Sequence, residues 1–97
     1  MKGVLHIDAG AAGALVTKGR SLLPAGIVRV EGRFERGDTV GIVGPDGDEI
    51  ARGLAGLSAA ECSQVAGRKL DAATRELGYV LPKAVIHRDN MLLLIQA

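Results

Sequence analysis

Short apolar stretches separated by turn residues predict a chain of strands and small helices. Residues 4–7 form an apolar run that predicts a first strand, and Asp8 follows it at once. An aspartate in this position accepts the free amide hydrogens of a helix start, so we expect a helix from there to about Thr17. Gly10 and Gly13 fall on one face of that helix. Because glycine weakens a helix, their presence favours tight packing against a strand, with an anion site as the alternative.

The next stretch, residues 27–31, alternates apolar and charged side chains after Val28, which is typical of a strand with one wet face. We expect Val28 and Val30 to point inward, and Arg29 and Glu31 to point to solvent.

A turn-rich connection follows over residues 32–38, with Phe34 as its one large apolar anchor. Residues 39–43 and 49–54 predict two further strands. The segment between them, Gly44-Pro45-Asp46-Gly47-Asp48, has strong turn chemistry, so the two strands should pair antiparallel.

Two short helices are predicted next. Ser58 and Glu61 have the spacing of a capping box, which predicts a helix to about Ala66. Asp71 is expected to start a second helix that stops at Gly78, where glycine adopts the left-handed conformation at low cost.

The end of the chain reads as a closing hairpin. Residues 83–88 and 91–95 are expected to pair around a tight turn at Asp89 and Asn90, two residue types that tolerate positive φ. The whole order predicts one α+β domain over residues 1–97, with a mostly antiparallel, curved sheet and short flanking helices.

Composition fits this small domain and excludes several classes of protein. The chain has 97 residues, of which 47% are hydrophobic but only 2% aromatic, so aliphatic side chains must fill the core. The net charge of +1 gives no global field for nucleic acid or an acidic membrane. Cys62 is the single cysteine, so no internal disulfide forms, and we expect it to be a small buried hydrophobe. With no apolar run of membrane-spanning length and no signal-peptide order, we expect an untargeted, cytoplasmic protein.

Several motifs, taken together, resemble a known family. They are Gly32-Arg33-Phe34-Glu35-Arg36-Gly37-Asp38-Thr39-Val40, Asp8-Ala9-Gly10-Ala11-Ala12-Gly13-Ala14-Leu15, Ser21-Leu22-Leu23-Pro24-Ala25-Gly26-Ile27 and His87-Arg88-Asp89-Asn90. In this order and spacing the chain resembles the PUA domain that closes glutamate 5-kinase chains. The resemblance implies a PUA-like pseudo-barrel cut from a longer enzyme, whose amino-acid kinase domain would lie upstream.

The resemblance implies a non-catalytic accessory domain. Glutamate 5-kinases use ATP and Mg²⁺ to phosphorylate glutamate in proline biosynthesis, and the residues for this reaction lie in the kinase domain. This chain has neither a nucleotide-binding glycine loop nor carboxylates arranged for magnesium, so no catalytic, cofactor or metal residue is assigned. Its work would be contact with its own kinase domain or a neighbouring subunit of a homo-oligomer, in assembly, bracing or proline feedback. The preferred contact residues are His87, Arg88, Asp89 and Asn90.

RNA binding is the alternative, because PUA domains elsewhere grip structured RNA with the first helix, the loop after it and an adjoining strand. In this chain that surface comprises Gly10, Gly13, Lys18, Gly19, Arg20 and Arg29, with Arg33, Arg36 and Arg88 as possible extensions. Near-neutral charge and the presence of only Phe34 and Tyr79 for base stacking weigh against it. The two functions differ in whether Lys18, Arg20 and Arg29 form one exposed basic surface. A free-standing small-ligand module is a third, less favoured interpretation, since it requires a sizeable polar pocket.

Two other polar groups are assigned no chemistry. Asp46, Asp48 and Glu49 lack the longer array of oxygen donors that a calcium loop requires, so we expect a solvated hairpin tip. His6 and His87 have no ligand-spaced partners, and both are expected on strands, His87 as a buried hydrogen-bonding group beside Arg88 and Asp89.

Overall fold

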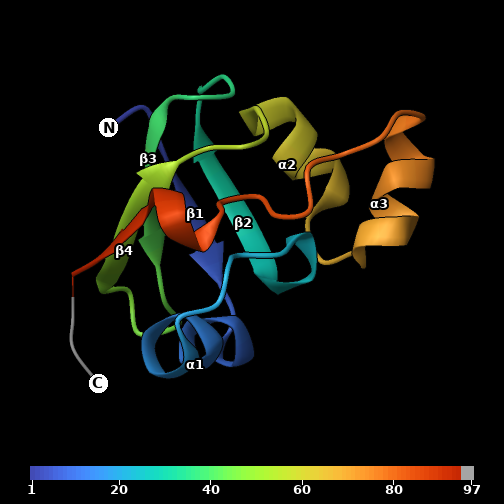
Figure 1. The fold of residues 1–97 in the computed structure, drawn as a ribbon. Coiled ribbons are helices and arrows are strands. Elements are labelled where there is room, and N and C mark those ends of the chain that lie inside the picture. The colour runs from blue at the N-terminus through green and yellow to red at the C-terminus, as the bar shows by residue number, and fades with distance from the viewer. Residues whose placement is uncertain (95–97) are drawn as a thin grey trace.

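The computed structural model describes residues 1–94 as one open, mixed sheet with helices at one end and along one side (Figure 1). The sheet has the order β2-β1-β3-β4-β5; three of its pairings are antiparallel, and β1 and β3 run parallel. The elements are β1 (Gly3–Ile7), α1 (Ala9–Lys18), η1 (Pro24–Gly26), β2 (Ile27–Gly32), β3 (Thr39–Val43), β4 (Glu49–Leu54), α2 (Ala59–Val65), α3 (Leu70–Leu77), η2 (Arg88–Asn90) and β5 (Met91–Leu93). The predicted α+β class with a mostly antiparallel sheet is confirmed.

Local signals in the sequence account for most element boundaries. Asp8 caps α1 by accepting a hydrogen bond from the Ala11 amide at 2.8 Å, and Gly19 ends that helix with φ 61°. Ser58 and Glu61 form the predicted capping box of α2. α3 begins one residue before the predicted start, with Asp71 in its first turn, and ends at Gly78 in the left-handed conformation as expected.

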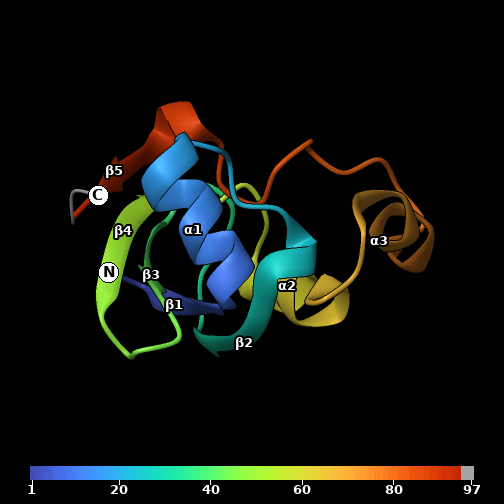
Figure 2. The ribbon, with the colours of Figure 1, turned by 90° about the horizontal axis from the view of Figure 1, so that it is seen from below.

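The core lies between the inner face of the sheet and the helices. In Figure 2, α1 crosses one end of the sheet, while α2 lies beside β2 and α3 lies beyond it. Aliphatic side chains fill the interior, as composition requires, and Phe34 is its one aromatic member. The fully buried side chains include Leu5, Leu15, Leu22, Val40, Ile42, Leu57, Val65, Val85 and Ile86.

The prediction that Val28 faces inward is wrong. Val28 is 67% exposed, whereas Ile27 before it is buried and Val30 is half-buried. The pairing of β1 with β2 explains this: Ile7 pairs with Ile27 but His6 pairs with Arg29, so Val28 is the extra residue of a β-bulge. The bulge resets the alternation, because Ile27 before it and Val30, two residues after it, both face the core.

The predicted closing hairpin is also wrong. Residues 83–88 form no regular strand; Ile86 makes one isolated bridge to Leu22, and the buried run 84–86 packs into the core. Asp89 and Asn90 belong to the 3-10 turn η2 with negative φ, and β5 pairs with β4 instead of the preceding segment. The end of the predicted final strand lies outside the described residues.

Close packing occurs at a different glycine from the two that the sequence singled out. A Cβ at Gly13 would meet nothing within 4 Å, and one at Gly10 would meet only the Asp8 carboxylate at 3.5 Å. A Cβ at Gly26 would instead lie 2.5 Å from that of Ala11. Tight packing therefore explains Gly26, where the chain enters β2 against α1, and not the glycines within the helix.

Candidate functional surfaces

The residues predicted to bind RNA lie at two opposite ends of α1. Lys18 ends the helix and Gly19 and Arg20 follow it, while Arg29 pairs with His6 on the strand that leads into the N-terminal end of α1. A ten-residue helix is about 15 Å long, so these basic groups form no single continuous surface. Gly10 and Gly13 lie between them on exposed or half-exposed turns of the helix.

Arg29 is engaged within its own sheet. Its Nη2 lies 2.7 Å from Glu31 Oε1 and 3.1 Å from His6 Nε2, and the same glutamate oxygen lies 2.6 Å from the imidazole. An acidic neighbour offsets the positive charge that a phosphate would need. Arg36 is also paired, with Glu61, and Arg33 makes no ion pair among residues 1–94. Arg29 is therefore not free to contribute to the predicted RNA-binding surface.

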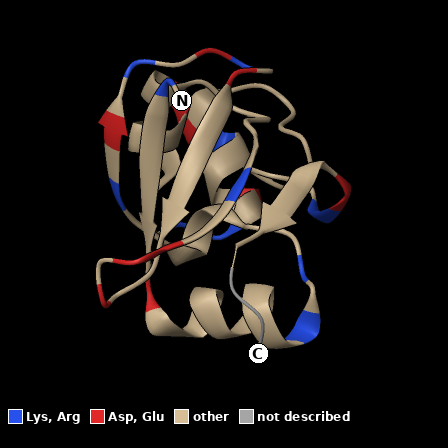
Figure 3. Cartoon of the chain, turned by 90° about the vertical axis from the view of Figure 1, so that its left-hand side faces the viewer, with Lys and Arg blue, Asp and Glu red and all other residues tan. Residues whose placement is uncertain are grey.

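The C-terminal end of α1 gathers basic groups from two parts of the chain, as the blue segments along one edge in Figure 3 show. The Arg88 amide donates to Ser21 Oγ at 2.9 Å, which brings η2 next to the loop that carries Arg20 and follows Lys18. Within the described part of the chain, Lys18 and Arg20 form no ion pair, while Arg88 is 4.0 Å from its neighbour Asp89. We call Lys18, Arg20 and Arg88 the basic edge.

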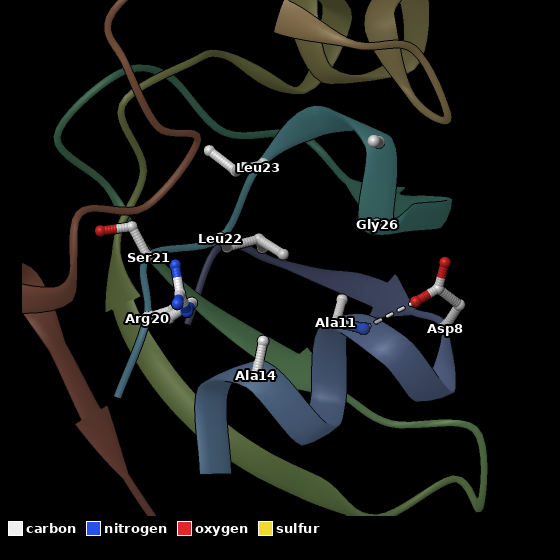
Figure 4. Close-up of a pocket in the computed structure, with 9 residues that line it drawn as sticks. Asp8, Ala11, Ala14, Arg20, Ser21, Leu22, Leu23 and Gly26 are labelled. Atoms are coloured by element: carbon white, nitrogen blue, oxygen red, sulfur yellow. Dashed lines mark hydrogen bonds between the residues drawn. The ribbon is translucent and has the colours of Figure 1, made fainter. Parts of the chain in front are cut away.

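A hollow of about 280 Å³ lies beside the basic edge, between α1 and the loop that follows it (Figure 4). Small and apolar side chains make most of its wall: Ala11 and Ala14 from the helix, Leu22 and Leu23 from the loop. Its polar groups are Asp8, which is already the helix cap, Arg20 and Ser21. The hollow thus offers few free polar groups for a specific small ligand.

The predicted contact residues form a protruding 3-10 turn. His87 caps it by accepting a bond from the Asp89 amide at 3.1 Å, and all four side chains are exposed. The expectation that His87 is buried on a strand is therefore wrong. Asp89 and Asn90 line one side of a shallow depression of about 430 Å³ on the sheet, together with β4 and β5.

Three exposed apolar side chains lie on the outer face of the sheet next to this turn, with Arg52 among them. Leu92 is 66% exposed, Leu54 45% and Met1 62%. Leu92 pairs with Arg52, two residues from Leu54, and both leucines line the depression beside Asp89 and Asn90. The Met1 side chain lies over Gly41, which pairs with Arg52 from the other side. We call Met1, Leu54 and Leu92 the outer patch, and Figure 3 shows this face of the strands without a helix over it.

Other polar groups have structural explanations. Asp46 and Asp48 are exposed at the β3–β4 turn, and Glu49 is bound to Arg52 at 2.9 Å. Among residues 1–94, no three side chains of the metal-ligating types are grouped to hold an ion. Cys62 is fully buried, as predicted, and burial raises the pKa of its thiol to about 12. No helix in the described range has both the length and the apolar character needed to cross a bilayer.

Sequence reasoning missed a cluster around Glu61. Its carboxylate accepts two hydrogen bonds from Arg36, one from the Ser58 amide and one from the Tyr79 hydroxyl. The bonds from Arg36, together with the other donors, lower the pKa of Glu61 to about 2, and the pKa of Tyr79 is raised because its hydroxyl donates to this carboxylate. The capping-box spacing marked Glu61 as structural, but no local pattern indicated the other two partners.

The sequence and the fold match one family. The model of the PUA domain family matches residues 3–77, and the chain belongs to that family. A PUA domain from Aeropyrum pernix, solved as a tartrate complex, is 30% identical and superposes with a TM-score of 0.66 over 90% of this chain and 42% of that one.

Curated relatives are glutamate 5-kinases. The enzyme of Trichlorobacter lovleyi is 55% identical over 92 residues, which cover 95% of this chain and 24% of that enzyme. The enzyme of Novosphingobium aromaticivorans is 49% identical over 94 residues, covering 97% of this chain and 25% of that enzyme. The chain therefore spans about a quarter of the length of the relatives it matches, and the resemblance inferred from its motifs is confirmed.

Proposed function

We propose that this chain is the PUA domain of a glutamate 5-kinase and serves that enzyme as a non-catalytic accessory domain. Support comes from the high identity to two such enzymes along nearly the whole chain. In this proposal, ATP, Mg²⁺ and glutamate bind in the remaining three quarters of the enzyme, where glutamate is converted to glutamyl 5-phosphate. The present chain contributes contact and phosphorylates nothing by itself.

The outer patch is the observation that carries the contact function. Exposed apolar side chains scattered singly need no explanation, but Leu54 and Leu92 line one depression on an uncovered sheet face, and Met1 lies on the same face beyond Arg52. Such a patch marks a protein interface more often than a solvated surface. The predicted contact residues Asp89 and Asn90 border it, which supplies a polar rim of the kind that protein interfaces have.

A cleavage experiment tests this function. A specific protease site is placed ahead of residue 1 in a glutamate 5-kinase chain that carries this domain, and the cleaved protein is passed over a sizing column. We expect the domain to stay with the kinase portion, and Leu54→Lys to release it while the fold persists. Free elution of the unaltered domain after cleavage would overturn the proposal.

RNA binding is a second candidate function, favoured by the basic edge. Lys18 and Arg20 have no ion-pair partner among residues 1–94, and Arg88 comes close to them from a distant part of the chain. Three cations near one hollow suit a phosphate backbone, whose counterions they would displace. The pairing of Arg29 with Glu31 and of Arg36 with Glu61 argues for the accessory function ahead of it.

Titration of a structured RNA, such as a tRNA, into the isotope-labelled chain tests the second candidate. Saturable amide shifts at Lys18, Gly19 and Arg20 that persist at near-physiological salt would support RNA binding. Lys18→Gln with Arg20→Gln should then abolish them, and Arg29→Gln is the matched control at the other end of α1. Diffuse shifts that salt removes would leave protein contact as the function.

A further inference from the structure

β5 is the last strand of the sheet, so one of its sides has no neighbouring strand among residues 1–94. The Leu94 amide donates to the Ile50 carbonyl at 2.8 Å, in register with the pairing of Leu92 and Arg52. In an antiparallel pair, residues whose N–H and C=O face the partner alternate with residues whose groups face away. Leu92 and Leu94 therefore face β4, and the backbone groups of Leu93 point to the open side.

The other side of β4 agrees with this assignment. The Ala55 amide donates to the Asp38 carbonyl at 2.9 Å, and the β3–β4 register carries the same alternation to Gly53 and Ala51. Those two residues face β3, which leaves Arg52 and Ile50 to bond β5. The free N–H and C=O at Leu93 thus follow from two independent hydrogen bonds.

Apart from its shortness, the open edge lacks the features by which proteins usually protect an edge strand. Charged side chains, prolines and covering helices discourage pairing with another chain. Here the edge consists of Leu92, Leu93 and Leu94, all exposed, and it continues onto the outer patch through Leu54. A strand this short offers few hydrogen bonds, so apolar contact must supply most of the stabilisation of any strand added to it.

We propose that β5 is a docking strand: an extended apolar segment from the kinase portion of the glutamate 5-kinase chain pairs with the open edge at Leu93 and covers Leu92. This inference rests on the proposed accessory function and names how the contact is made. The segment donates to the Leu93 carbonyl and accepts from its amide, while its side chains bury the exposed leucines.

A second copy of this domain fits the surface less well. Two β5 strands that pair edge to edge extend the sheet in its own plane, which leaves Leu54 and Met1 on the outer face uncovered. The relatives are about four times as long as this chain, so a covering segment is available within the same polypeptide. A segment that pairs with β5 and then crosses the outer face covers both the edge and the outer patch.

Hydrogen exchange with single-residue resolution tests the inference. In the 97-residue chain alone, the amides of Leu92 and Leu94 should exchange slowly and that of Leu93 fast, because only Leu93 points to the open side. In the whole enzyme that carries this domain, we expect the Leu93 amide to slow by about tenfold or more. Slow exchange at Leu92 and Leu94 in both proteins serves as the internal control.

Substitutions separate the backbone bond from the side chain. Leu93→Pro removes the outward N–H without removing a bond to β4, and Leu93→Ala keeps that N–H. We expect Leu93→Pro to release the cleaved domain from the kinase portion at a concentration about tenfold higher than Leu93→Ala does. If the proline variant does not fold, Leu92→Lys replaces it, with Val80→Lys as the matched control at an exposed apolar position outside the patch.

Each outcome decides a different point. If the cleaved domain stays bound while Leu93 remains unprotected, strand addition is wrong and the accessory function stands. Free elution of the cleaved domain would overturn both strand addition and the accessory function. Protection of Leu93 in the isolated chain that grows with its concentration would make a second copy the partner and overturn the assignment to the kinase portion.

Discussion

Arg36 and Glu61 form a two-point ion pair, with Nε 2.9 Å from Oε1 and Nη2 2.7 Å from Oε2, across 25 residues of sequence. Arg36 lies in the loop before β3, and Glu61 lies in the first turn of α2. The Tyr79 hydroxyl, just after α3, donates to the same carboxylate. One side chain thus joins three segments that have no strand pairing with one another.

Replacement of Glu61 should therefore cost more than the loss of an ordinary surface ion pair. Glu61→Ala removes the capping box and the carboxylate that Arg36 and Tyr79 share. We expect it to lower the free energy of unfolding by at least about 1 kcal/mol. Glu61→Gln keeps an oxygen for the Ser58 amide and should cost less. Urea unfolding of both variants measures this; equal losses would mean that the oxygen kept by Glu61→Gln contributes nothing.

The same carboxylate predicts a pH dependence of stability. Because the folded pKa of Glu61 is about 2, below its ordinary value of 4.5, the unfolded chain takes up a proton first as pH falls. The stabilisation is complete above about pH 4.5 and is lost between there and pH 2. The difference in unfolding free energy between the unaltered protein and Glu61→Gln should shrink across that window. A difference independent of pH from 7 to 3 would contradict the assignment.

The close approach of Gly26 to Ala11 predicts a destabilising substitution with a specific rescue. Gly26→Ala places two Cβ atoms 2.5 Å apart, so α1 must shift, at a cost of about 1–3 kcal/mol. Ala11→Gly in the same chain should recover part of that loss by reopening the space. Thermal unfolding of the two single variants and the double variant measures the coupling, and purely additive losses would count against the steric explanation.

Gly13→Ala should stabilise the chain, in contrast to Gly26→Ala. A Cβ at Gly13 meets nothing within 4 Å, and the residue lies within α1, so the change raises helix propensity without a clash. We expect stability to rise by about 0.5–1 kcal/mol, read from the urea midpoint. If the change destabilises the chain instead, the space beside Gly13 is not open in the folded protein and the packing explanation is wrong.

Cys62 should report on opening of the core. Its thiol is fully buried, and its raised pKa of about 12 keeps it neutral at pH 8, so a disulfide reagent has no accessible thiolate in the folded state. We expect labelling to be slow in the native protein and to accelerate with urea along the unfolding curve. Fast labelling without denaturant would place Cys62 in a locally opening segment.

Signals contained within a few residues predicted their elements well. The capping box at Ser58, the glycine stop at Gly78 and the turn over residues 44–48 each satisfy hydrogen-bonding or φ requirements locally, so they keep their form wherever the rest of the chain packs. The resemblance to the PUA family rested on longer motifs and identified the fold that these local signals left open.

Features that depend on distant partners were not predictable in this way. Alternation at residues 27–31 failed because the β1–β2 register inserts a bulge at Val28, which only the partner strand reveals. Asp89 and Asn90 suit a hairpin turn, but β5 pairs with β4, and the buried run 84–86 packs into the core. The basic edge and the outer patch likewise join residues far apart in sequence, which no spacing rule places together.

The parallel pairing of β1 with β3 also limits how quickly the chain can fold. β1 has a neighbouring strand on each side, but these partners, β2 and β3, follow it in the sequence only after α1 and a further loop. No two-strand unit involving β1 can form from a tight turn, so loop closure over tens of residues precedes the first long-range ladder. As the polypeptide leaves the ribosome, β2 is available to β1 once residue 32 has emerged, but the parallel neighbour β3 is complete only when residue 43 has emerged.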